Sequence, residues 1–474
     1  MKQYKFASWL KFILFSAIGI FVFFINFNVP QYQINLGPWH WGAVAAQSNV
    51  LVSHVTNFIK AALFTGNFKA MPFIVWGIGV YSIVDLFVLR PNKFWHTTKV
   101  AAVFAVFKII GFILLCFAVI SIYLGWNPGF MNWFFQPVAS LGDVSISSFI
   151  MNNILVSICI SIPVASVFLP LLVDYGLVDF VGVVVRPVMR PVFKLPGRAA
   201  VIMVSAFLGN FSVGHIAVND QYKTGRMTER EAVVIGTSFS TVSVGFLLVL
   251  ANNTGLNERG YWNLYFWTAF LITMLVSLIG VRIYPLRKIT DAYYSSAKPQ
   301  PEPVIREKLL KVALEEAVEV TERQESLLKR IAYIMKETIG VLGTVASGTA
   351  FFATLGVLLY TYTPVIKWIG YIFYPLMRIA IPQSEAAVAC TGAAVSFIEV
   401  TIPALLVMVG EWSMRIRYMM AVIPVTSIIF LASFVPCLMA TDIPVSFKDM
   451  VIIWVERMLL SVLITGIFAL ILFP

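Results

Sequence analysis

Long apolar runs constrain the fold of this chain more than any other feature of its sequence. A helix rises 1.5 Å per residue, so about 20 apolar residues cross the roughly 30 Å hydrocarbon core of a bilayer. The runs are continuous rather than alternating, which favours helices over barrel strands. They cover residues 8–29, 71–89, 100–124, 148–173, 229–252, 261–285, 334–361, 415–439 and 449–473. The sequence therefore predicts an all-α, polytopic membrane protein with about nine spanning helices.

Charged residues are few, and their distribution predicts the topology. Lys and Arg number 34 among 474 residues, against 23 acidic residues. In a membrane protein this excess indicates the cytoplasmic side and contact with the lipid bilayer, so we expect no nucleic acid partner. Lys2 and Lys5 precede the first run and a basic loop follows the second, whereas 125–147 holds only Asp143. This pattern places the N-terminus in the cytoplasm.

The cysteines and histidines, which often carry catalysis or metal binding, do not occur in motifs typical of either function. The four cysteines lie in apolar segments without a CxxC pair, and the histidines lack an HExxH motif. The residues concerned are Cys116, Cys159, Cys390 and Cys437, and His40, His54, His96 and His215. We therefore expect no enzymatic activity, no metal site, no disulfide and no cofactor.

Two parts of the sequence resemble one another. "RPVMR" at 186–190 matches "YPLMR" at 374–378, and "AVVIGTS" at 232–238 matches "AVIPVTS" at 421–427. The offsets are 188 and 189 residues, so the register holds. A Pro-rich, mixed-charge linker, which we expect to contain a cytoplasmic helix, separates the two parts. The predicted units are N-terminal transmembrane helices at 1–147, a first repeat at 148–285, the linker at 286–333 and a second repeat at 334–474.

Each repeat contains a segment rich in small residues, at 197–218 and 383–410. Such residues suit a re-entrant helical hairpin, whose free backbone groups must face protein or water. If both segments are re-entrant, each half crosses the membrane three times, and the second half is inverted relative to the first. Inverted repeats are a transporter architecture. The alternative is that both segments are ordinary packed helices.

Glu399 stands out because an acidic group inside a membrane costs about 2.5 to 3.5 kcal/mol on insertion scales. It lies about midway along the second small-residue segment, just before Pro403. We expect Glu399 to bind the solute or carry a proton. The other predicted solute-binding residues are Asn210, Ser212, His215, Ser396, Thr401, Thr426 and Ser427, and the predicted ion-binding residues are Asn210, Thr237 and Ser238.

The stretches "LGNFSVG" at 208–214 and "VSFIEVTIPALLV" at 395–407 resemble the nucleoside-recognition, or Gate, domain family of bacterial membrane proteins. This family is distantly similar to concentrative nucleoside transporters. The resemblance implies a protein of the bacterial inner (plasma) membrane, with Glu399 as the second-hairpin acid, Asn210 as a first-hairpin amide and Ser238 as a helix hydroxyl beside it. Val213 and Gly214 stand where the nucleoside transporters carry a Gln-Thr-Glu type cluster, so the solute is left open.

The sequence thus predicts a secondary active transporter for a small polar solute, nucleosides among the candidates, with sodium (Na+) or protons as the coupling ion. A second hypothesis is a non-transporting membrane scaffold or accessory subunit, like spore-maturation membrane proteins, that docks partners through the linker. A homo-oligomer and an accessory membrane subunit are the candidate assemblies.

Overall fold

The computed structural model describes residues 5–36, 39–64, 70–89, 99–141, 143–208, 211–239, 241–300, 309–439 and 441–474, and it is mostly helical. Within these ranges, eight helical segments are long and apolar enough to span a membrane. They are Phe6–Phe24, Met71–Val88, Ala102–Leu124, Ile146–Val173, Glu229–Asn253, Trp262–Gly280, Leu327–Tyr362 and Phe447–Leu472. Eight of the nine predicted runs therefore correspond to candidate spans.

The all-α prediction is wrong for the segment that follows the first helix. Strand β1 (Asn26–Val29) pairs with β4 (Gln47–Val50), and β2 (Tyr32–Leu36) pairs with β3 (Trp39–Val44), both antiparallel. Apolar and polar residues alternate along β2, which is the period of a strand. A third, very short pair joins β5 (Pro137–Val138) and β6 (Val144–Ser145).

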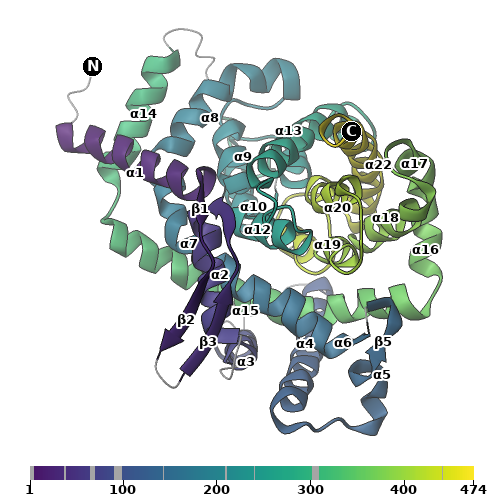
Figure 1. Cartoon of the computed structure of the whole chain (residues 1–474). Helices are drawn as coiled ribbons and strands as arrows, with labels where there is room; N and C mark the ends of the chain where they lie inside the picture. The colour runs from purple at the N-terminus through teal and green to yellow at the C-terminus, as the bar shows by residue number, and fades with distance from the viewer. Residues whose placement is uncertain are drawn as a thin grey trace.

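The N-terminal part packs against the longest helix of the second half. It comprises α1 (Phe6–Phe24), α2 (Leu51–Phe64), α3 (Met71–Val84) and α4 (Lys99–Leu124). Helix α15 (Leu327–Tyr362) crosses α3, α4 and α7 (Val156–Val173), as Figure 1 shows. A Cβ on Gly111 of α4 would lie 1.9 Å from the Ser347 carbonyl oxygen, so glycine permits this close approach.

The first half continues from α7 into an amphipathic helix, a helical hairpin and a broken helix. These are α8 (Leu177–Val188), the α9 (Ala199–Leu208) and α10 (Phe211–Lys223) pair, and then α11 (Glu229–Val234), the π-helix η6 (Ile235–Phe239) and α12 (Val244–Asn253). Helix α13 (Trp262–Gly280) ends this half. Thr228 and Glu231 form the capping box that starts α11, as their spacing predicts.

The second half has the same order of elements. After α15 come α16 (Val365–Gly370) and α17 (Tyr374–Ala380), then the α18 (Gln383–Val395) and α19 (Ile402–Leu406) pair. Next are α20 (Met414–Ser427) and α21 (Phe434–Met439), and finally α22 (Phe447–Leu472). In both small-residue segments two consecutive helices pack on one another, and in the second segment residues 396–401 separate them.

The predicted continuous helix at 415–439 is wrong, because α20 ends at Ser427 and α21 begins at Phe434. Pro424 cannot donate a backbone hydrogen bond in the last turn of α20. Ile428 then has a φ of 52°, a conformation that a β-branched residue rarely adopts. Strain of this kind is concentrated at ligand sites and switch regions.

The described part of the linker contains one long helix, α14 (Leu309–Arg323). It packs on α8 and α1, with Arg186 donating two hydrogen bonds to Glu316 at 2.9 and 2.7 Å. Helix α15 begins at Leu327, before the predicted start at 334, and Arg330 in its first turn binds Asp174 through two bonds of 2.9 Å. These ion pairs hold the linker helix and the start of α15 against the first half.

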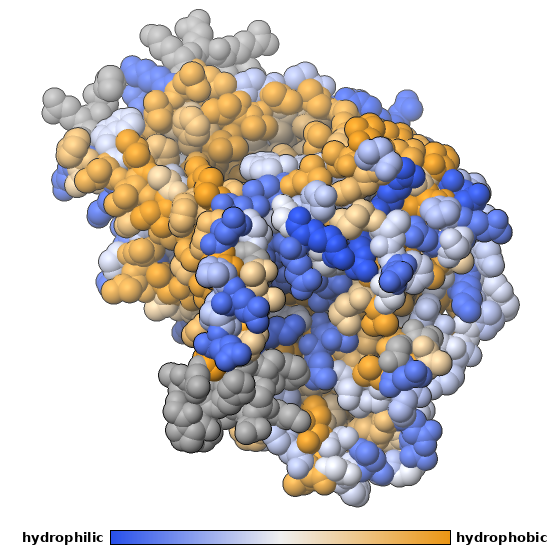
Figure 2. All heavy atoms as spheres, viewed as in Figure 1, coloured by the Kyte–Doolittle hydropathy of each residue, from blue (hydrophilic) through white to orange (hydrophobic). Residues whose placement is uncertain are grey.

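The surface is divided between hydrophobic and hydrophilic areas. Figure 2 shows hydrophilic atoms gathered in the middle of the viewed face, where α12, α19 and α20 lie in Figure 1, with hydrophobic atoms mainly at the left and the top of the view. Large apolar side chains are exposed on α1, α3 and α4, as expected of helices that contact lipid.

Candidate functional site

Glu399 lies in the break between α18 and α19, which spans residues 396–401. Its side chain is 1% exposed. Oε1 accepts hydrogen bonds from the Thr401 backbone N–H at 3.2 Å and from the Thr401 hydroxyl at 3.0 Å. Oε2 is buried without a hydrogen bond to any described residue, and the Thr349 side chain of α15 and the Val400 backbone lie close to the carboxylate. One oxygen of a buried carboxyl group is therefore available to a ligand or a proton.

The break at 396–401 pairs with the break at 428–433 through backbone hydrogen bonds. Leu431 N–H donates to Phe397 O at 2.8 Å, and Ala432 N–H donates to Ile398 O at 3.2 Å. These bonds satisfy backbone groups that the interrupted helices leave without intrahelical partners. The tip of the second hairpin and the broken helix α20–α21 thus form one hydrogen-bonded unit.

The first hairpin reaches the same region through His215 on α10, which is 1% exposed. Its Nε2 lies 3.0 Å from the Gly236 carbonyl oxygen of η6, whereas Nδ1 has no partner among the described residues. The imidazole also packs on Phe434 of α21, with ring centroids 4.9 Å apart. His215 therefore contacts the broken helices of both halves. We call the breaks at 241–243, 396–401 and 428–433, with the residues that link them, the crossing.

The predicted hydroxyl residues lie at the crossing, and several of them donate to their own helices. Ser396 donates to Ala393 O, Thr426 to Ile423 O, Ser427 to Pro424 O and Thr237 to Val233 O, at 2.7 to 3.3 Å. The hydroxyl oxygens of Thr237 and Ser238 are 3.5 Å apart. Hydroxyls that donate in this way keep lone pairs for a ligand. Asn210 and the Ser212 side chain lie outside the described part of the chain.

Arg457 is the residue at the crossing that sequence reasoning missed. It lies on α22 and is 1% exposed. Nη2 donates to Thr426 O at 2.6 Å, and Nη1 donates to the Ser277 hydroxyl at 3.2 Å. Ser277 in turn donates to Ser238 O at 2.6 Å. A cation in the middle of the apolar run 449–473 is the signal that could have found it.

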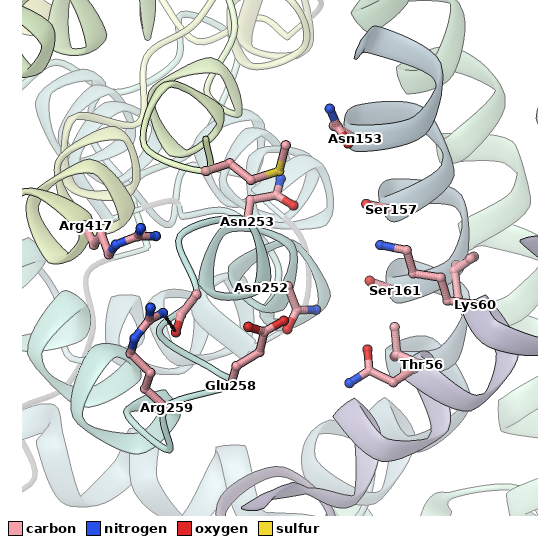
Figure 3. Close-up of a pocket in the computed structure, with 14 residues that line it drawn as sticks. Thr56, Lys60, Asn153, Ser157, Ser161, Asn252, Asn253, Glu258, Arg259 and Arg417 are labelled. Carbon is pink, nitrogen blue, oxygen red and sulfur yellow. Dashed lines mark hydrogen bonds between the residues drawn. The ribbon is translucent and has the colours of Figure 1, made fainter. Parts of the chain in front are cut away.

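A polar cavity of about 410 Å³ lies among segments of the N-terminal helices and of both halves (Figure 3). Helices α2 and α7 form one wall, and the end of α12 with the turn after it forms the other. Its polar lining consists of Thr56, Asn57, Lys60, Asn153, Ser157, Ser161, Asn252, Asn253, Glu258, Arg259 and Arg417. Figure 3 shows Lys60, Ser157 and Ser161 on the side opposite Asn252 and Glu258.

Two of these lining residues have contrasting roles. Arg417 is structural, because its guanidinium donates to the carbonyl oxygens of Trp412, Thr254 and Gly410. Asn253, by contrast, is buried and its Nδ2 has no partner among the described residues. Asn253 therefore lines the cavity as a residue with a buried hydrogen-bond donor that no described residue satisfies. The sequence reasoning did not identify this cavity, because its walls come from segments far apart in the chain.

Residues 155–257 match the family model described as Gate, nucleoside recognition. The resemblance to the Gate family is confirmed. The matched segment includes the first hairpin and the broken helix α11–α12. It supports the expectation of a membrane transport protein that is not an enzyme.

Similar proteins cover nearly the whole chain. A relative from Alkalihalophilus pseudofirmus, described as an uncharacterized protein, is 27% identical over 468 residues, which are 95% of this chain and 92% of the relative. The solved structure of CNTnw in an inward-facing substrate-bound state is 14% identical with a TM-score of 0.40, covering 84% of this chain and 98% of that chain. A variant of CNTnw in an outward-facing state is 11% identical with a TM-score of 0.41, covering 98% of this chain and 97% of that chain. These TM-scores are too low to carry an argument about mechanism.

Proposed function

We propose that this protein is a secondary active transporter of a small polar solute, coupled to sodium or protons and working by alternating access. The observation that carries the proposal is the reciprocal packing of two helical hairpins on two broken helices, with the buried Glu399 at the crossing. The Gate match supports a nucleoside-like solute. In this proposal the protein lies in the bacterial inner membrane with its N-terminus in the cytoplasm.

The reciprocity is visible in the contacts between the halves. Helix α10 of the first hairpin packs on α21 of the second half, and α19 of the second hairpin packs on α12 of the first half. Helices α7 and α15 pack together, as do α13 and α22. This exchange of equivalent partners is what two repeats related by a two-fold axis produce. It supports inverted repeats at 148–285 and 334–474, with re-entrant hairpins at 197–218 and 383–410.

Glu399 is the proposed centre of the site. Its unpaired Oε2 either accepts a hydrogen bond from the solute or carries the coupling proton. In our proposal Asn210, Ser212, His215, Thr237 and Ser238 form the half-site of the first repeat, and Ser396, Thr401, Thr426 and Ser427 form that of the second. In this proposal the polar cavity is a point of entry for a polar solute.

Uptake into proteoliposomes tests the proposal. A panel of nucleosides, nucleobases, amino acids and dipeptides is first screened by thermal stability in detergent, since a ligand at 100 times its Kd stabilises the native state by about 2.7 kcal/mol. Uptake of any hit is then measured for wild type, Glu399→Gln and Glu411→Gln. Glu411 is the matched control, because it lies exposed in the loop after the same hairpin. Normal uptake by Glu399→Gln, or no stabilising solute and no uptake at all, would overturn the proposal.

The scaffold hypothesis rests on the linker helix α14, whose Leu310 side chain is exposed, as is that of Leu328 in the first turn of α15. Ala313, Ala317 and Val318 on its other face are buried against the first half, so deleting the helix would disturb the fold. A Leu310→Ser, Leu328→Ser double variant is the sharper test. A scaffold would lose partner binding in a pull-down, whereas a transporter would keep its uptake.

A further inference from the structure

Arg457 is a fully buried cation in a spanning helix, and the described residues provide it with no carboxylate partner. The ion pairs of the described chain join Arg186, Lys223, Arg323, Lys329 and Arg330 to acidic groups, and Arg457 is not among them. Its bonds go to the Thr426 carbonyl oxygen and the Ser277 hydroxyl. An unpaired charge at this depth is expensive, so its presence calls for a function.

Arg457 is connected to two carbonyl groups near the ends of interrupted helices, directly to that of Thr426 and through the Ser277 hydroxyl of α13 to that of Ser238. Thr426 is the second-last residue of α20, and Ser238 is the second-last residue of η6. Carbonyl groups in the last turn of a helix have no intrahelical donor and carry partial negative charge, which favours a cation. The repeated motifs place Thr426 opposite Thr237 and Ser427 opposite Ser238, since "GTS" at 236–238 matches "VTS" at 425–427, so the two carbonyl groups lie one position apart in the alignment.

The bonds form one continuous path between the halves. Arg457 binds the Thr426 carbonyl directly and reaches the Ser238 carbonyl through Ser277, whose hydroxyl donates at 2.6 Å. Oxygen ligands at the C-terminal ends of broken helices are the kind of site that coordinates a coupling cation in secondary transporters. Here, a protein side chain already supplies positive charge to both ends.

We propose that the Arg457 guanidinium is a tethered cation that takes the place of a coupling sodium ion at the crossing. Sodium then has no site at Thr237 and Ser238, and Glu399 is left as the group that couples transport, through a proton. The coupling statement rests on the proposed function. The placement of the cation does not, because it follows from the contacts of Arg457.

Thermal unfolding of the purified protein in detergent tests the placement without a known solute. Wild type is measured in NaCl and in KCl at equal ionic strength, and we expect the same Tm in both. Arg457→Ala leaves two carbonyl groups without positive charge, so we expect a Tm lower by several degrees that millimolar guanidinium or sodium ions restore in part. Arg457→Lys keeps the charge and should lose less.

Arg282→Ala is the matched control. Arg282 also donates to two carbonyl oxygens, those of Leu278 at 2.6 Å and Val192 at 2.7 Å, but it lies beyond the end of α13 and is partly exposed. We expect no rescue of this variant by added cations. If Arg457→Ala does not fold, the inference is still tested by the wild-type Tm in NaCl against KCl and by the Tm of Arg457→Lys.

A sodium-specific rise in the wild-type Tm that disappears in Thr237→Val would overturn the inference, as would an Arg457→Ala variant as stable as wild type. Sodium-dependent uptake abolished by Thr237→Val would also overturn it while leaving the transporter proposal intact. Absence of uptake for every solute would instead remove the transporter proposal and leave the stability results in place.

Discussion

The two halves of the crossing share a backbone plan but differ in chemistry. The second hairpin places Glu399 at its break, with one carboxylate oxygen unpaired. The first hairpin places His215 against the Gly236 carbonyl of its own broken helix and against Phe434 of the other half. The second hairpin therefore carries a buried acid with one unpaired oxygen, whereas the first hairpin carries the packed imidazole of His215. The two halves thus share an order of elements without sharing the polar side chains at their breaks.

The substitution Glu399→Gln tests this difference between the halves most strongly. We expect uptake to fall by at least about 100-fold, because the amide cannot carry a proton and presents an NH₂ group where the carboxylate accepts. The Tm should stay near wild type, since the amide retains an oxygen that accepts from Thr401. Uptake kinetics and circular dichroism check the two expectations. A variant that loses fold together with uptake would show that Glu399 is structural.

The next largest effect should come from Ser277→Ala, which interrupts the path between the halves. It leaves the Ser238 carbonyl and one Arg457 nitrogen without their partner, and each buried unsatisfied group costs about 1–3 kcal/mol. Urea or thermal unfolding in detergent measures the loss. Ser461→Ala on α22 is the matched control, because that buried hydroxyl has no partner among the described residues. Equal stability of the two variants would contradict the path.

A smaller effect is expected from His215→Gln, which keeps a donor that can reach Gly236 O. If the imidazole is a packing residue, uptake should stay within about tenfold of wild type, and stability should fall by about 1 kcal/mol from lost ring contacts with Phe434 and Phe211. The same uptake assay and unfolding experiment apply. A loss as large as that of Glu399→Gln would mean that both halves carry the chemistry.

The smallest effect should come from Asp442, in the loop between α21 and α22, which joins the first hairpin to the second half. Lys223 at the end of α10 lies 2.9 Å from its carboxylate, and this hydrogen bond lowers the pKa of Asp442 from its ordinary value. A lowered pKa in the folded state means that the stabilisation is present above the unfolded pKa and is lost as the pH falls through the folded pKa. Both side chains are about half exposed, so salt should weaken the pair.

The measurement is Tm against pH for wild type and Asp442→Asn. We expect the two curves to converge at acidic pH and to separate slightly above the ordinary pKa of an aspartate. A separation that does not change with pH would show that the ion pair contributes nothing to it, since the bond from Asp442 N–H to Asn219 Oδ1 is kept in both proteins.

Much of the fold was predictable because a membrane helix can be recognised from the residues of its own segment. Eight apolar runs, the capping box at Thr228 and the helix in the linker follow from length, spacing and helix propensity. The break after Ser427 was not predicted, because the residues at 428–433 are as apolar as their neighbours. What opens the helix there is a partner, the tip of the second hairpin, which supplies backbone acceptors at Phe397 and Ile398.

The candidate site was likewise predictable from the sequence only in part. An acid in an apolar run identified Glu399 because a charge in a membrane is costly wherever it is placed. A buried Arg457 is costly for the same reason. Its role, however, depends on contacts with Ser277 and Thr426, which are 180 and 31 residues away in sequence. The polar cavity likewise needs α2, α7 and α12 to meet.

The sequence by itself determined that the chain spans a membrane, that it contains two similar parts and that Glu399 lies among apolar residues, because these depend on composition and spacing. Only the tertiary structure decided where the helices break, which carbonyls Arg457 reaches and which hydroxyls donate to their own helices. The physical reason is that an interrupted helix in an apolar setting is stable only when groups from distant segments satisfy its free backbone atoms.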